Sequence, residues 1–197
     1  MRTLVFTAFA LIAFAANSVL CRAALGRNAI DPAGFTLVRL AAGAATLLPL
    51  AGLARRRGGG WLSAALLSLY AIGFSYAYLS LGAGTGALIL FGAVQSTMIG
   101  SALRSGERPH RWEWTGLAVA LGGLVYLVSP GLTAPSLGGS LLMALAGVSW
   151  GCYSLRGRGS RDALADTAGN FLRAAPLAAA AAALGAGGLH FSARGVA

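Results

Sequence analysis

Seven apolar stretches, each near or above the length that crosses a bilayer, occupy almost all of this 197-residue chain. A hydrocarbon core about 30 Å thick takes roughly 20 helical residues to cross. The stretches lack the alternation of apolar and polar residues that marks a barrel strand, and a helix satisfies its own backbone hydrogen bonds in lipid. The sequence therefore predicts an all-α, multispanning transmembrane helix bundle with spans at 4–25, 33–53, 61–82, 84–103, 114–132, 137–155 and 168–188.

The net charge of +10 comes from fifteen basic residues, all of them arginine. With Arg2, the clusters Arg55–Arg57, Arg104/Arg108/Arg111 and Arg156/Arg158/Arg161 place ten arginines on one side of the predicted spans. The positive-inside rule predicts that this side, with the N-terminus, faces the cytoplasm. No aromatic-interleaved basic surface lies outside the spans, so nucleic acid is not an expected partner. The expected partner is the lipid bilayer.

The two cysteines, Cys21 and Cys152, are too few for a disulfide framework and are expected to be small buried side chains. The first apolar stretch is either a cleaved signal or a retained helix. Seven spans with a regular charge bias favour the retained helix.

A shift of 134 residues places Leu11 on Leu145, Arg22 on Arg156 and Arg39 on Arg173. In both copies a span ends at an arginine, and a second arginine lies a few residues inside the next span. A repeat of five spans crosses the membrane an odd number of times, so the second copy enters from the opposite side. We therefore expect one complete five-helix repeat at 1–134 and the first two helices of an inverted second repeat at 135–197. Many alternating-access transporters are built on inverted repeats.

The whole chain resembles the EamA family of the drug/metabolite transporter superfamily. The resemblance is carried by Asp31-Pro32 and Arg39 at the second span, by the turn Gly106-Glu107-Arg108 before the fifth, and by Ser149-Trp150-Gly151. Family members carry two five-span repeats, so the resemblance implies ten spans and a chain that stops after the seventh. It also implies transport of a small solute, with no cofactor.

Arg39 and Arg173 are candidate substrate-binding residues, because ionisable groups inside a span are expensive and often functional. Two interpretations of Arg39 stay open. Its guanidinium either extends to the outer headgroups or serves as a cavity cation that binds carboxylate or phosphate.

Asn17, Gln95 and Trp150 complete the candidate substrate-binding set. A buried amide in lipid must find a partner, so Asn17 and Gln95 either join helices or line the solute path. Trp150 lies where the resemblance places the opening of the second repeat. Small residues four apart, Gly92/Ser96/Gly100 and Gly147/Gly151, are expected to be helix contacts.

None of the five acidic residues lies inside a predicted span, so the carboxylate that a proton-coupled exporter of cationic drugs typically needs is missing. Glu107 is expected to pair with a neighbouring arginine rather than to couple transport. His110 and His190 are far apart in sequence, which gives a metal site little support. No catalytic grouping appears, and an enzyme is not expected.

The leading hypothesis is a multi-pass transporter of the bacterial inner membrane, a probable exporter of small polar metabolites such as amino acids, working by alternating access. The alternative is a truncated, non-transporting membrane protein, either a remnant or one that needs another chain to complete the bundle. A second copy of this chain is a further partner to consider.

Overall fold

The computed structural model describes residues 2–26, 30–52, 58–107, 110–128 and 135–184. Within them it has seven helices, as the spans predict. They are α1 (Arg2–Gly26), α2 (Pro32–Ala51), α3 (Trp61–Ala77), α4 (Ala83–Arg104), α5 (Arg111–Val128), α6 (Leu137–Gly157) and α7 (Ala163–Leu184).

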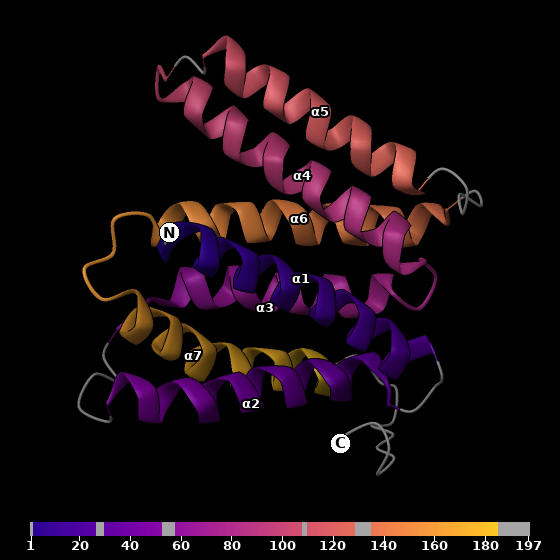
Figure 1. Ribbon diagram of the computed structural model, residues 1–197. Helices are drawn as coiled ribbons and strands as arrows, with labels where there is room; N and C mark the ends of the chain where they lie inside the picture. The colour runs from indigo at the N-terminus through magenta and orange to yellow at the C-terminus, as the bar shows by residue number, and fades with distance from the viewer. Residues whose placement is uncertain (1, 27–29, 53–57, 108–109, 129–134, 185–197) are drawn as a thin grey trace.

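Successive helices run in opposite directions, so the start of α1 and the ends of α2, α4 and α6 lie at one end of the bundle (Figure 1). Arg104, Arg111 and Arg156 belong to helix ends on that side. Arg55–Arg57 and Arg108 lie outside the described residues. We call this end of the bundle the arginine end.

Helix boundaries depart from the predicted spans where local caps decide them. The carboxylate of Asp31 accepts from the Gly34 amide at 2.8 Å, and Pro32 follows at the first helical position, so α2 begins there. The carboxylate of Asp162 accepts from the Ala165 amide at 3.1 Å. As a result α7 begins at Ala163, five residues before the expected span, and its first turn contains Asp166.

The core is built around α3, which packs against α2, α6 and α7. Its Ala64, Leu67, Phe74 and Tyr78 are almost fully buried. By contrast, α1 turns large apolar side chains outward, among them Phe6, which is 71% exposed. An apolar surface of that extent suits a lipid surrounding rather than water.

Three helices of the described chain are long and apolar enough to cross a membrane by length and hydropathy, and they cover Thr3–Leu25, Pro32–Ala51 and Ala83–Arg104. The helix Trp61–Ala77 is apolar but shorter. The fold is that of a multispanning helical membrane protein.

Glycines set the approach of α6 to α4. A Cβ at Gly147 would lie 2.6 Å from the Leu90 carbonyl oxygen, and one at Gly151 would lie 2.9 Å from Cβ of Thr97. These two are helix contacts, as expected. Gly92 and Gly100 are not, because a Cβ there would meet nothing within 4 Å, and α4 instead presents Leu90, Ala93, Val94 and Thr97 to α6.

Candidate functional site

A cavity of about 400 Å³ lies between α1 and the helices of the core. It is lined mainly by apolar and aromatic side chains, with two polar members. The lining residues are Ala10, Ala13, Phe14, Asn17, Arg39, Leu40, Leu67, Tyr70, Ala71, Trp150 and Phe171. Three of the five candidate substrate-binding residues, Asn17, Arg39 and Trp150, therefore meet at one place.

Arg39 is partly buried and lies against α3. Its Nη2 donates to the Tyr70 hydroxyl at 3.3 Å, and its Nη1 lies 4.0 Å from Sγ of Cys21. The guanidinium carbon lies 5.0 Å from the ring centre of Phe74 and 5.5 Å from that of Tyr70, within cation–π range. The guanidinium thus lies at the cavity, and its binding of a carboxylate or phosphate stays a prediction.

No carboxylate of the described residues lies within ion-pair distance of Arg39. A guanidinium has five N–H donors, and here two of them have a partner. The aromatic rings stabilise the charge without neutralising it. Among the described residues, the lining of the cavity thus has one positive charge, and three of its N–H donors have no partner there.

Aromatic rings from four helices pack together beside the cavity. Trp150 packs against Tyr70 with ring centres 4.8 Å apart and against Phe14 at 6.2 Å. Phe14 also meets Phe91 edge-on at 6.3 Å. The sequence analysis did not select Phe14, Tyr70 or Phe171. A tyrosine in mid-span was the available signal, because its hydroxyl needs a partner in lipid.

Asn17 lies one helical turn from Cys21, whose thiol donates to its Oδ1 at 3.8 Å. Gln95 is exposed on α4 and does not line the cavity.

Arg173 also lies away from the cavity, at the arginine end. Its Nη1 donates to the carbonyl oxygens of Gly58 at 2.7 Å and Gly169 at 2.9 Å, and its guanidinium lies 6.0 Å from the Trp61 ring centre. It ties α7 to the segment just before α3.

A second, polar pocket of about 280 Å³ lies beside this contact. The Asp166 carboxylate accepts from the Gly59 amide at 2.7 Å, and Asn170 accepts from the Gly60 amide at 2.9 Å. We call these two hydrogen bonds the glycine latch. A Cβ on Gly58 would lie 2.5 Å from the Ala165 carbonyl oxygen, so the close approach requires glycine.

Hydrogen bonds from the Ser160 hydroxyl and the Gly59 amide hold the pKa of Asp166 below its ordinary value. The predicted spans leave Asp166 outside the membrane and without a role. Its place in the first turn of α7 is visible only once the helix start is known.

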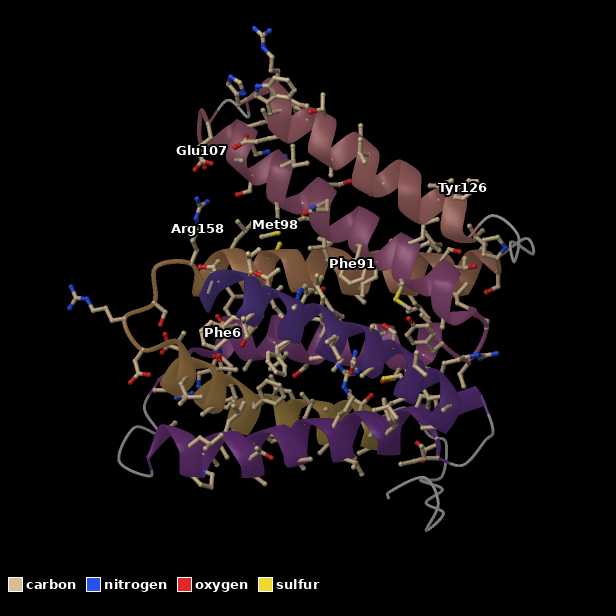
Figure 2. The ribbon with its side chains drawn as sticks, viewed as in Figure 1. Phe6, Phe91, Met98, Glu107, Tyr126 and Arg158 are labelled. Carbon is tan, nitrogen blue, oxygen red and sulfur yellow. The ribbon has the colours of Figure 1, made fainter. Side chains whose placement is uncertain are left out.

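The Gly106-Glu107-Arg108 turn ends α4. Gly106 has φ +79°, and the Glu107 amide donates back to the Ala102 carbonyl at 3.0 Å, a helix termination that favours glycine. Glu107 pairs with Arg158 of the neighbouring connection at 3.6 Å, and Figure 2 shows the two side chains pointing toward one another. Arg108 lies outside the described residues.

The sequence matches known proteins over most of its length. Uncharacterized protein PA1977 of Pseudomonas aeruginosa is 54% identical over 182 residues, which make up 90% of this chain and 63% of that relative. The chain thus spans less than two-thirds of the relative's length. No solved structure matches it. The pattern of the EamA-like transporter family matches residues 1–129, well over half of the sequence. With its apolar helical bundle, the chain belongs to the EamA-like transporter family.

Proposed function

We propose that the protein carries small polar metabolites, such as amino acids, across the bacterial inner membrane, as an exporter. The observation that carries the proposal is the cavity, where Arg39, Asn17 and Trp150 meet among apolar side chains. Solute sites commonly combine an apolar lining with a few polar groups that fix orientation. No covalent chemistry is part of the proposal, which is for a transporter and not for an enzyme.

The proposed mechanism is alternating access between two inverted repeats, at residues 1–134 and 135–197. The packing of α6 on α3 and α4, and of α7 on α2 and α3, supports it, because the second unit then borders the cavity through Trp150 and Phe171. The proposed orientation puts the N-terminus and the arginine end in the cytoplasm, on the positive-inside rule. The relative comes from a bacterium, which supports the proposal that the membrane is a bacterial one.

The test is Arg39→Ala, assayed as export of amino acids from cells or uptake into inverted vesicles. Transport is expected to be abolished while the amount of protein in the membrane is unchanged. Gln95→Ala is the matched control, because Gln95 is a polar residue of a span that lies outside the cavity. Full transport by Arg39→Ala would refute the role given to Arg39.

A second candidate function follows from the coverage of the relative, of which the chain matches 63%. In that case this chain does not transport alone and requires a completing chain or a second copy. Intact mass of the protein extracted from its own membrane, together with cross-linking there, tests this. A cross-linked partner, with transport appearing only on co-expression, would favour it over transport by the chain alone.

A further inference from the structure

The charged side chain in the lining of the cavity is positive, and no negative side chain of the described residues lines it. Arg39 is the charged member of its lining, and the carboxylates of the described residues lie elsewhere, with Glu107 and Asp166 toward the arginine end. The second polar member, Asn17, uses its Oδ1 to accept from Cys21, and its amide nitrogen has no hydrogen bond to the described residues. Both polar groups therefore offer donors to a solute.

A partly buried cation held among aromatic rings attracts an anion more strongly than it would in bulk water, because the local dielectric is lower. Burying a charge is costly unless it is paired. A bound carboxylate would supply the missing negative charge and accept two parallel N–H bonds from the guanidinium fork. An ammonium group on the carbon next to that carboxylate would be repelled by Arg39, and no described carboxylate of the lining would compensate.

The remainder of the lining suits an apolar group. Phe14, Tyr70, Trp150 and Phe171 line the cavity together with alanines and leucines, and these four aromatic members come from four different helices. Such a wall stabilises a flat or branched apolar group by surface burial and ring contact. A small anion without that group would leave this wall in contact with water.

From this arrangement we infer that the proposed solute class narrows to amphipathic organic monoanions, carboxylates with an aryl or branched alkyl group. Zwitterionic amino acids, the example given under the proposed function, then bind less well. The inference rests on the proposed function in treating this cavity as the solute site. Arg39 selects the charge of the solute, and the wall made by Phe14 and Trp150 selects its apolar part.

The test is equilibrium binding to the purified full chain in lipid nanodiscs, followed by calorimetry with four matched probes. These are 3-phenylpropanoate, phenylalanine, 3-phenylpropanamide and propanoate. 3-Phenylpropanoate is expected to bind at least about tenfold more tightly than each of the others. Phenylalanine adds an ammonium group, 3-phenylpropanamide lacks the negative charge, and propanoate lacks the aryl group. Raising the salt concentration should weaken binding of 3-phenylpropanoate less than surface ion pairing would predict, since Arg39 is partly buried.

Arg39→Gln should remove the preference for 3-phenylpropanoate over its amide. Arg104→Gln, with the same change of charge at the exposed end of α4, is the control and should leave it intact. Trp150→Leu should weaken binding of 3-phenylpropanoate while leaving that of propanoate unchanged. Should Arg39→Gln fail to fold, the inference is tested instead by the order of affinities of the four probes, measured on the unaltered chain and on Arg39→Lys.

Equal binding of phenylalanine and 3-phenylpropanoate would overturn the inference, as would binding of none of the probes. Both outcomes leave transport itself untouched. The expected ranking together with absent transport in vesicles would instead count against the proposed function alone.

Discussion

The contact between α6 and α4 gives the most stringent test of the fold, because glycine is required on one side of it. At Gly147, a Cβ would lie 2.6 Å from Cβ of Ala93 and 2.6 Å from the backbone oxygen of Leu90. Neither neighbour is the end of a flexible side chain. Gly147→Ala must therefore push the two helices apart, and the bundle loses packing along the whole contact.

Gly92→Ala is the matched control, since Gly92 lies within α4 and a Cβ there meets nothing within 4 Å. Both variants gain the same helix propensity, roughly 0.5–1 kcal/mol. The difference between them therefore isolates the cost of overpacking, about 1–3 kcal/mol. At about 2–4 °C per kcal/mol for a chain of this size, the two unfolding temperatures should differ by roughly 2–12 °C.

The assay is thermal unfolding of the detergent-solubilised chain, followed by size-exclusion chromatography after heating. Gly147→Ala should unfold below both the unaltered chain and Gly92→Ala. Adding Ala93→Gly removes one of the two close contacts and should recover part of the loss, whereas adding the same change to Gly92→Ala should not stabilise that variant. Unfolding temperatures that coincide for Gly147→Ala and Gly92→Ala would refute the close approach of α6 to α4.

Two further predictions concern the arginine end. Asp166→Asn should weaken the glycine latch, so the Gly59 amide should exchange hydrogen several-fold faster, consistent with a lost bond of about 1 kcal/mol. Because the folded-state pKa of Asp166 is lowered, its contribution is present above the ordinary carboxylate pKa and is lost as pH falls through the lowered value. Protection in the unaltered chain should therefore stay constant from about pH 8 to 5 and fall below about pH 4, and a constant value down to pH 3 would contradict the role of the carboxylate. For topology, Ser105→Cys and Ser136→Cys, each in a cysteine-free background, should react with an impermeant maleimide from opposite sides, Ser105→Cys from the cytoplasm. Labelling of both from one side would contradict the alternation of the helices.

The sequence was sufficient to predict the helices, because crossing a bilayer constrains length and hydropathy residue by residue. It was less informative about where helices end. Because Asp162 caps α7, the helix begins more than one turn before the predicted span. This places Asp166 inside the helix instead of in the preceding connection. The residue at which a helix begins depends on which of several nearby polar side chains caps it. The sequence alone does not show which one does.

The cavity was predictable in part. Arg39, Asn17 and Trp150 stood out as polar or motif residues in apolar spans, and all three line it. Tyr70 and Phe171 did not stand out, because an aromatic residue in an apolar run is compatible with core, lipid contact and solute contact alike. Their role depends on which helices meet, and that is set by packing between residues far apart in the chain.

Arg39 and Arg173 show that residues matched by a sequence shift can have different surroundings. They are matched by the 134-residue shift, yet Arg39 lies against Tyr70 and Phe74, and Arg173 lies against Trp61 and the Gly58 carbonyl. Both α2 and α7 pack on α3, a single helix with one direction and no second copy of itself in the described chain. The two arginines consequently contact opposite halves of α3. Arg39 lies against buried aromatic rings, and Arg173 lies at the start of the helix, beside the glycines that precede it. Positions matched by the sequence shift thus lie at a cavity in α2 and at backbone carbonyls in α7.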